Sequence, residues 1–521
     1  ALTVATNTGA LMAQAAASSV NKEMEISMER LSTGKRINGA ADDAAGVAIA
    51  SRLTSEIRGT NQAIRNAMDG QALIDTAEGA HEEVTNLLQR MRELSVQAAN
   101  DTNTASDRVT LQSEVTQLLA EITRISDQTS FGGINLLDGT FSSKSFQVGA
   151  EANQSITVGI DSIATTSLGV QTKSSLVNMA TGTANGVDAT ADMVVSGKDG
   201  SVTIDVSAND TAKTVTNLIN AQTQNTGVSA KAVTNVKLSG LSATGTVGMT
   251  VNGTALSTTT LNDTNDLRDL VAAINAKAGT TGVVAKIGSS NAELIMTDAD
   301  GDDIKIGSFD HSSNGDGLII TALDQDEAAI STTLAGRLKD TTFTTSGTGE
   351  NTAFTVAGQI KMSSHSAFTI VTTGDAAADG LTDGGGTTTA DTMISHNEFF
   401  GGDSGSAGDV TETSSMTNIG TADVSTRAGA NTAIEAIDAA LSKIASARGD
   451  LGAISNRLDS TVNNLTSISS NLVASRSNIE DADFAAETTN LAKSQILQQA
   501  STAMLAQANA SKQNVLSLLQ G

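Results

Sequence analysis

A ladder of apolar residues near the C-terminal end constrains the fold of this chain most strongly. Its rungs recur at strict seven-residue steps, at Ile437, Ile444, Leu451, Leu458, Leu465 and Leu472. Such a seam is typical of a helix that supercoils around other helices. A helix over residues 434–472 would be about 60 Å long at about 1.5 Å per residue. Other long helices must therefore cover its apolar face.

The N-terminal part of the sequence supplies candidate partners. Residues 42–100 and 106–128 predict two long helices with the same seven-residue repeat, carried by Ala77, Val84, Met91 and Ala98 and by Leu111, Leu118 and Ile125. Thinner apolar stripes predict helices over residues 1–34 and 480–519, and stripes this weak need partners. The residues expected to pack these terminal helices and to carry polymerisation are Leu2, Met12, Val20, Leu31, Phe484, Leu491, Leu497, Met504, Val515 and Leu518.

The centre of the chain has a different pattern. Residues 145–148 and 155–160 alternate in a way that predicts strands or a hairpin, and residues 176–415 are rich in Thr, Gly, Ser and Asp. Residues 218–232 align with residues 273–287, 55 positions later, and both contain Ile-Asn-Ala followed by Thr-Gly-Val. Each copy predicts a strand, a short helix that ends at Ile-Asn-Ala, a glycine turn and a second strand. The repeat therefore predicts two α+β lobes of one design.

These patterns predict a nested, multidomain fold: a long α-helical coiled-coil bundle built from both termini, with a β-hairpin, and inserted β-rich α+β outer domains. We expect paired terminal helices from 1–42 and 479–521, and a helical bundle with the hairpin from 43–175 and 418–478. We expect the first outer domain, which contains the repeat, over 176–310, and a second, β-rich one over 311–417.

Composition excludes several kinds of protein. The 521 residues include no Cys, Pro, Trp or Tyr, so disulfides and cysteine-ligated metals are excluded. The net charge of −26 argues against nucleic acid or anionic membranes as partners. No apolar run approaches the ~18 residues of a membrane helix, and the first residues lack the features of a Sec-type signal peptide. We therefore expect no membrane insertion, and any export would use another route.

Three short motifs invite a chemical interpretation, and each has a simpler one. Asp42 and Asp43 are adjacent, which suits a helix cap better than a paired acid–base site. His81-Glu82-Glu83 begins like a zinc-protease motif, but Thr85 stands where the second His is needed. Residues 298–303 resemble the start of a calcium loop but lack its Gly and Glu, so a solvated turn is favoured. We predict no enzyme, no metal and no cofactor.

Motifs at both ends resemble those of bacterial flagellins. They are Arg30–Leu53 (RLSTGKRINGAADDAAGVAIASRL), Gln89–Asn100 (QRMRELSVQAAN), Ser477–Phe484 (SNIEDADF), Gln495–Asn509 (QILQQASTAMLAQAN) and Asn514–Leu519 (NVLSLL). The resemblance covers residues 1–170 and 420–521, and implies a subunit of the extracellular flagellar filament used for motility, exported unfolded through the type III system. It implies as partners further copies of the chain, an export chaperone, the filament cap and the hook-junction proteins.

Gln89, Arg90, Glu93, Leu94 and Glu114 have two interpretations. They fit a bundle surface and subunit interface, with Leu94 on the seam. Flagellins with this Gln-Arg-x-Arg-Glu-Leu pattern are also bound by toll-like receptor 5, and by resemblance Arg90, Leu94 and Glu114 would contact it. Two other functions stay open: a hook–filament junction protein, and a surface adhesin whose Ser/Thr-rich centre binds surfaces or carries O-linked glycans. Mass spectrometry of native filaments would test for the glycans.

Overall fold

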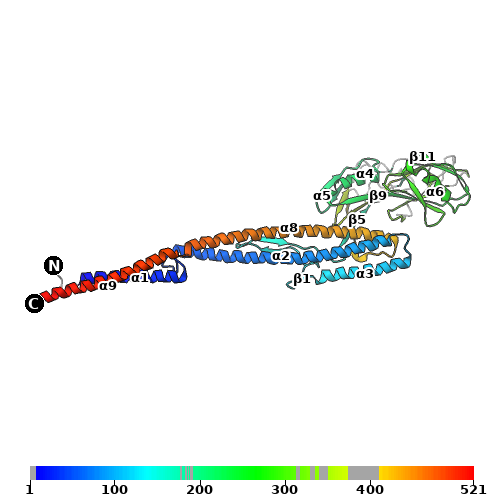
Figure 1. Ribbon diagram of the computed structural model, residues 1–521. Helices are drawn as coiled ribbons and strands as arrows, with labels where there is room; N and C mark the ends of the chain where they lie inside the picture. The colour runs from blue at the N-terminus through cyan, green and yellow to red at the C-terminus, as the bar shows by residue number, and fades with distance from the viewer. Residues whose placement is uncertain are drawn as a thin grey trace. The chain divides into compact units, whose positions relative to one another are not determined.

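The computed structural model describes residues 7–175, 179–181, 185, 187, 192–312, 317–328, 335–338, 350–351, 353–372 and 410–520. The chain forms two compact units. The first contains Ala1–Gly79, Phe141–Ile160 and Gly449–Gly521, and the second contains Ala80–Thr140 and Asp161–Arg448. The fold is the predicted one: terminal helical regions and a central β-rich region (Figure 1).

The five long helices that the sequence predicts are all present. They are α1 (Thr8–Thr33), α2 (Ala44–Ala98), α3 (Ala105–Gln128), α8 (Arg427–Glu480) and α9 (Phe484–Gln520). Capping hydrogen bonds explain where α2 and α3 begin. In α3 the Thr104 hydroxyl accepts a hydrogen bond from the Asp107 amide, and the Asp107 carboxylate accepts one from the Thr104 amide. Asp43 accepts from the Gly46 amide at 2.9 Å, which confirms the predicted cap of α2.

The seven-residue ladder faces the protein interior. The rungs from Ile437 to Leu465 are at most 8 % exposed, and Leu472 is half-buried. The α2 rungs Ala77, Val84, Met91 and Ala98 are all fully buried. Because both helices bury one stripe and expose the rest, the coiled-coil interpretation of the two seams is confirmed.

In the first unit a hairpin lies against the helices. It consists of β3 (Lys144–Gln147) and β4 (Ser155–Val158), and Phe146 pairs with Ile156. The amide of Asn66 in α2 donates to the Gln147 carbonyl at 3.0 Å. A Cβ at Gly70 would lie 3.4 Å from both Phe146 and Leu458. The small residue thus lets α2, α8 and the hairpin meet closely.

In the second unit, α2 and α3 are followed by a two-stranded ribbon, β1 (Ser130–Phe131) and β2 (Ile134–Asn135). The central region forms three larger sheets. The nine-stranded sheet contains β5 (Gly169–Ser174), β9 (Ser229–Ser239), β13 (Val284–Ile287), β14 (Glu293–Asp298), β16 (Ile319–Leu323), β17 (Ala335–Leu338), β18 (Glu350–Asn351), β20 (Gln359–Ser364) and β23 (Ser415–Asn418).

The other two sheets are smaller. The six-stranded sheet contains β6 (Met179–Thr181), β10 (Gly245–Val251), β11 (Thr254–Ala255), β12 (Thr259–Leu261), β15 (Ile304–His311) and β19 (Ala353–Val356). The four-stranded sheet contains β7 (Met193–Ser196), β8 (Ser201–Ile204), β21 (Thr369–Thr372) and β22 (Val410–Thr413). A 3-10 turn, η1 (Ile419–Thr421), precedes α8.

The internal repeat has the predicted form. The first copy contains α4 (Ala212–Ala221), α5 (Thr223–Thr226) and β9, and the second contains α6 (Arg268–Asn275), α7 (Ala278–Thr281) and β13. Each second helix ends at a left-handed glycine, Gly227 or Gly282, where a residue with a Cβ would be strained. One hydrophobic core surrounds α4 and another surrounds α6.

Strand β9 connects the two cores. Its Ala232 belongs to the core around α4, whereas its Val236 and Leu238 belong to the core around α6. Strand β15 also pairs with β19, and β9 with β20, so the sheets join segments on both sides of residue 310. The predicted limits of the outer domains stay a prediction.

Candidate assembly surface and receptor-contact cluster

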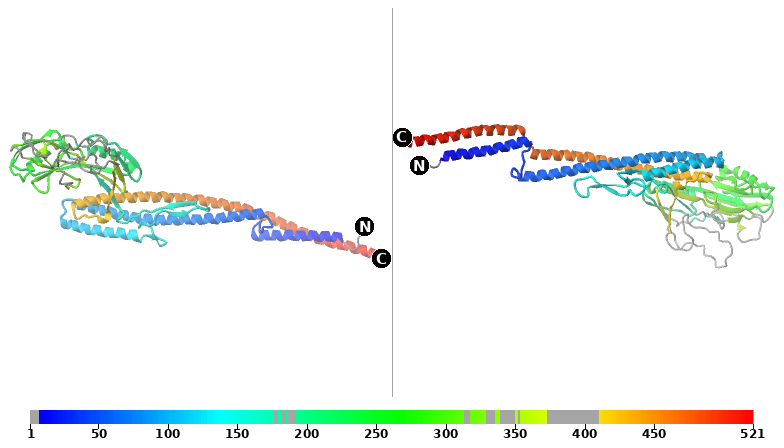
Figure 2. Two further views of the ribbon diagram at one scale, coloured as in Figure 1. Left: turned by 180° about the vertical axis from the view of Figure 1, so that it is seen from behind. Right: turned by 90° about the horizontal axis from the view of Figure 1, so that it is seen from below.

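The terminal helices α1 and α9 run antiparallel and lie side by side (Figures 1 and 2). Polar contacts tie them together along their length, and they join Asn7 to Ala508 at 3.2 Å, Gln498 to Asn21 at 2.8 Å and Arg30 to Glu487 at 3.8 Å. The N-terminal residues of one helix thus meet the C-terminal residues of the other. This pairing is what the nested sequence pattern predicts.

The contact between these two helices buries very little apolar surface. Among their described side chains only Ser27, Glu487 and Ser494 are buried, and all three are polar. Full burial of a Leu, Met or Phe side chain stabilises a fold by about 1.5–3 kcal/mol. No described apolar side chain of α1 or α9 provides that contribution inside this chain.

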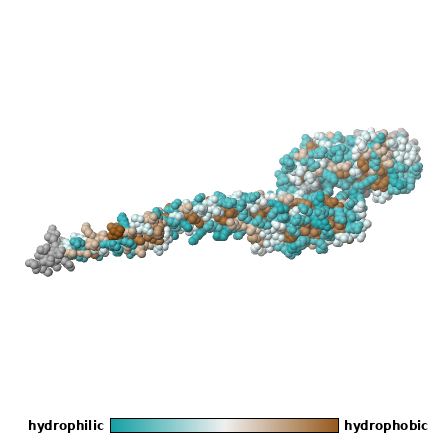
Figure 3. Space-filling view, viewed as in Figure 1, coloured by the Kyte–Doolittle hydropathy of each residue, from teal (hydrophilic) through white to brown (hydrophobic). Residues whose placement is uncertain are grey.

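Large apolar side chains of the pair are instead exposed. They are Leu11 (56 %), Met12 (76 %), Met28 (55 %), Phe484 (67 %), Ile496 (66 %), Leu497 (39 %) and Met504 (66 %). Figure 3 shows apolar residues among polar ones on the surface of this helix pair. Seven large apolar side chains exposed on one helix pair indicate an interaction site. We call these seven residues the terminal apolar surface.

The predicted packing residues divide into three groups. Met12, Phe484, Leu497 and Met504 belong to the terminal apolar surface. Val20, Leu31 and Leu491 are half-buried. Leu2 and the side chains of Val515 and Leu518 lie outside the described residues. Sequence reasoning missed Leu11, Met28 and Ile496, because it followed one stripe along each helix and these residues lie beside it.

A joint connects the terminal pair to α2 and α8. The Arg36 amide donates to the Glu480 carbonyl at 2.6 Å, and the Ala482 amide donates to the Gly34 carbonyl at 3.0 Å. Gly34 ends α1 with a φ of 70°, in the left-handed region that favours glycine. The breaks after α1 and after α8 are therefore bonded to each other.

The carboxylate of Asp42 organises the loop at this joint. It accepts hydrogen bonds from the amides of Asn38 and Gly39 at 3.0 and 2.9 Å. The bonds from Gly39 and then Asn38 hold the pKa of Asp42 below its ordinary value. The predicted loop-and-cap role of the Asp42–Asp43 pair is confirmed.

The receptor-contact candidates lie in the second unit, on α2 and α3. The Arg90 guanidinium contacts Glu114 with N–O distances of 2.8–2.9 Å and Glu93 at 3.0 Å. These contacts, Glu93 first, raise the pKa of Arg90. The three charged side chains are 44–69 % exposed. Gln89 is exposed as well, whereas Leu94 is 1 % exposed and lies on the buried seam.

The residues with a metal or catalytic interpretation do not converge. His81 is fully buried in α2. Residues 298–303 form a turn in which Asp298 accepts from the Asp300 amide at 3.0 Å. The turn was predicted to be solvated, which is wrong for Asp298 and Asp303, since they are 4 % and 6 % exposed. Within the described residues no group of three His, Cys, Asp or Glu side chains could hold a metal ion.

Comparison with known proteins agrees with this architecture. Residues 4–142 match the bacterial flagellin N-terminal helical region, residues 434–519 match the bacterial flagellin C-terminal helical region, and residues 185–247 match the flagellin hook IN motif. The chain is 36 % identical over 530 residues to the B-type flagellin of Pseudomonas aeruginosa, and the match covers 100 % of both chains. It is 34 % identical over 553 residues to a flagellin of Salmonella choleraesuis, which covers 99 % of each.

The fold and its termini define a structural protein with a helical core built from both chain ends. The chain belongs to the bacterial flagellin family. Among solved structures, the match to FliC from Burkholderia pseudomallei covers 74 % of this chain and 99 % of that chain, at 19 % identity and a TM-score of 0.27. In the part of the chain that the structure describes, no helix is long and apolar enough to cross a membrane.

Proposed function

We propose that this chain polymerises into the extracellular helical filament of the bacterial flagellum. The observation that carries the proposal is the terminal apolar surface on a helix pair that buries no described apolar side chain of its own. A filament requires a heterologous interface that repeats without closing. Neighbouring copies can bury this surface, and membership of the flagellin family supports that use.

The same observation suggests how assembly and folding are coupled. Isolated helices gain most of their stability from tertiary packing, and α1 and α9 have little of it within one chain. We infer that the terminal helices fray in the monomer and become fully ordered against neighbouring subunits, with the ordering cost met at that step. The apolar area buried between copies then drives both events.

Export and the further partners are part of the same proposal. We infer that the chain leaves the cell unfolded through the flagellar type III system, with an export chaperone, and adds to the filament between the hook-junction proteins and the cap. The absence of cysteine supports this route, because the unfolded chain cannot cross-link during transit.

Recognition by toll-like receptor 5 is a second proposal, and the exposed cluster around Arg90 favours it. Arg90 forms ion pairs with Glu93 and Glu114 on the exposed surface, whereas Leu94, four residues after Arg90 in α2, is buried. We expect Glu114→Lys to weaken receptor binding by monomer at least about tenfold, as the loss of a charge-assisted contact would. Glu83→Lys, at an exposed position of α2, is the matched control. Equal binding by both variants would refute the proposal.

The assembly proposal is tested with Ile496→Ser, which removes a 66 % exposed side chain from α9. The test follows seeded assembly by pelleting and helix content by far-UV circular dichroism. We expect the wild-type chain to gain helix and form pelletable filaments. Ile496→Ser should keep the monomer spectrum and assemble several-fold less, because the side chain packs only between copies. Gln495→Ser, at the neighbouring exposed polar position, is the matched control.

The outcomes separate the alternatives. Normal assembly by Ile496→Ser would show that the terminal apolar surface is not the interface. A wild-type monomer that is fully helical at its ends and never pellets would contradict the filament proposal, and would favour a junction protein or an adhesin. Hydrogen exchange at the terminal amides checks the coupling, since complete protection in the monomer is incompatible with fraying ends.

A further inference from the structure

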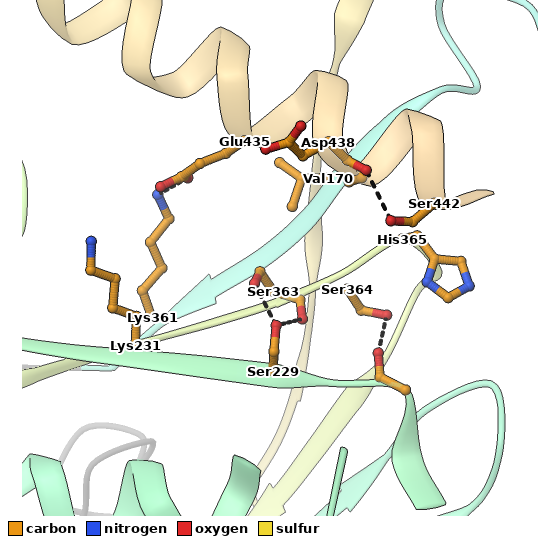
Figure 4. Close-up of a pocket in the computed structure, with 12 residues that line it drawn as sticks. Val170, Ser229, Lys231, Lys361, Ser363, Ser364, His365, Glu435, Asp438 and Ser442 are labelled. Carbon is orange, nitrogen blue, oxygen red and sulfur yellow. Dashed lines mark hydrogen bonds and ion pairs between the residues drawn. The ribbon is translucent and has the colours of Figure 1, made fainter. Parts of the chain in front are cut away.

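A polar cleft of about 350 Å³ lies between the β9–β20 face and α8 (Figure 4). Both walls belong to the second compact unit. Four serines line it, namely Ser229, Ser363, Ser364 and Ser442, together with charged side chains from both walls. Apart from Gly227, the apolar residues that line it are Val170 and Ala439. Most of the residues that line the cleft are therefore polar or charged.

The strand wall of the cleft is basic. Lys231 of β9 and Lys361 of β20 are directly opposite each other in the antiparallel register, and like charges in that position destabilise a sheet. Lys361 is neutralised by Glu435 of α8, with an Nζ–Oε2 distance of 2.7 Å. Lys231 has no ion-pair partner among the described residues. Two lysines side by side are unusual in a chain with a net charge of −26.

The helix wall of the cleft is acidic. Glu435 and Asp438 lie three residues apart and therefore on one face of α8. Asp438 is held by Arg92 of α2, with N–O distances of 2.6 and 3.3 Å. Glu435 is left to bond across the cleft to Lys361. A second polar contact between described side chains of the β-rich region and α8 joins the Lys198 ammonium to the Ser446 hydroxyl at 3.3 Å.

The segments that enter and leave the lobe are anchored differently. Leu168, Val170, Ile419 and Val424 are at most 4 % exposed, and the Ile419 amide donates to the Leu168 carbonyl at 2.9 Å. Strands β5 and β23 continue from this point as an antiparallel pair. The base of the lobe is therefore fixed by apolar burial, whereas the contact across the cleft between described side chains of β20 and α8 is polar.

We propose that Lys361 and Glu435 form a salt-sensitive latch that seats the β9–β20 face on α8, with the apolar base as its hinge. The two side chains are 22 % and 45 % exposed, so the pair is screened by salt. An ion pair with this exposure changes a population by a factor of about five at most. Closure is thus reversible: screening or reversing the pair raises the fraction of molecules in which the β9–β20 face is open from α8, and restoring the pair lowers it.

The test measures the width of the cleft directly. The chain has no native cysteine, so Ser363→Cys and Ser442→Cys place one spin label on each wall. At low salt we expect one narrow distance distribution, and at about 1 M sodium chloride, where the Debye length is about 3 Å, a longer and broader one. Because the pair changes the closed-to-open ratio by about fivefold at most, Lys361→Glu should raise the open fraction even at low salt while part of the population stays closed. Lys361→Glu with Glu435→Lys should restore the closed distribution.

The matched control reverses one charge of an exposed ion pair elsewhere in the β-rich region. Lys286 bonds to Glu327 away from the cleft, and Lys286→Glu should leave the distribution unchanged. Lys361→Glu also brings a carboxylate opposite Lys231, which favours the sheet, and circular dichroism checks that the lobe stays folded. A distribution that is unchanged by Lys361→Glu, or one that the double reversal does not restore, would overturn the latch.

Discussion

Asn220 and Asn275 occupy the same place in the two copies of the repeat, and their bonds explain why the sequence keeps Asn there. The Asn220 amide donates to the Ala230 carbonyl and accepts from the Ala230 amide, at 2.9 and 2.8 Å. Asn275 makes the same two bonds to Ala285, both at 2.8 Å. A side chain with one donor and one acceptor thus replaces a backbone pair at the start of the following strand.

Asn275→Asp tests this role. The carboxylate keeps the acceptor, loses the donor and places charge against the Ala285 carbonyl, so we expect a loss of about 1–3 kcal/mol in the stability of that lobe. Thermal unfolding and hydrogen exchange at β13 measure it. Asn291→Asp, at an exposed position nearby, should change little. Equal effects of the two substitutions would mean that the paired bonds do not stabilise the lobe.

Asp303 predicts an unusual pH dependence. Burial raises its pKa to about 6, and the bond from Asn185 at 3.3 Å only partly offsets this. The raised pKa means that the folded chain takes up a proton near pH 6, before the unfolded chain does. The contribution of Asp303 to stability therefore increases as pH falls from about 7 to about 4.

Asp303→Asn should remove that dependence. The amide oxygen can still accept from Asn185, and no charge is buried, so we expect a gain on the order of 1–2 kcal/mol at pH 7.5 that disappears near pH 4. Unfolding curves across this range measure it, with the exposed Asp326→Asn as control. A variant that is less stable than wild type at pH 7.5 would show that the carboxylate is needed in its charged form.

The long helices are the elements that the sequence predicts best, because a period of seven depends only on local spacing. At Leu458, which is fully buried, we expect Leu458→Ala to cost about 2–4 kcal/mol, as cavity-forming substitutions do. Ile468→Ala, at a 38 % exposed position of the same helix, should cost less than about 1 kcal/mol. Denaturant unfolding followed by circular dichroism compares them. Similar losses at both sites would contradict the burial of the seam.

The strands of the centre show the limit of prediction from sequence. The helix, glycine turn and strand of each repeat follow from local residues such as Gly227 and Gly282. The pairing of β9 with β14, β16 and β20 does not, because these partners are 50 to more than 100 positions away in the sequence. Nor could the sequence place Lys231 opposite Lys361, since register depends on which strands meet.

At the scale of the whole molecule, charge sets the conditions for assembly. Copies with a net charge of −26 repel one another, so we expect a larger pelleted fraction at about 0.5 M than at about 0.05 M sodium chloride, where screening is weak. The test uses sodium chloride and not a sulfate salt, because sulfate would also strengthen apolar burial and its effect could not be told from screening. A pelleted fraction that does not rise with sodium chloride would mean that repulsion does not limit assembly.

The sequence alone determined the long helices, the nesting of a β-rich centre between helical termini, the duplicated motif and the flagellin signatures. These are local periods and residue strings, and they need no knowledge of distant contacts. Tertiary structure alone decided that α1 and α9 bury only Ser27, Glu487 and Ser494 among their described side chains, that Arg90 pairs with Glu114 of another helix, and that Lys361 reaches Glu435. Burial and ion pairing depend on which distant segments meet, and that is settled only when the chain folds.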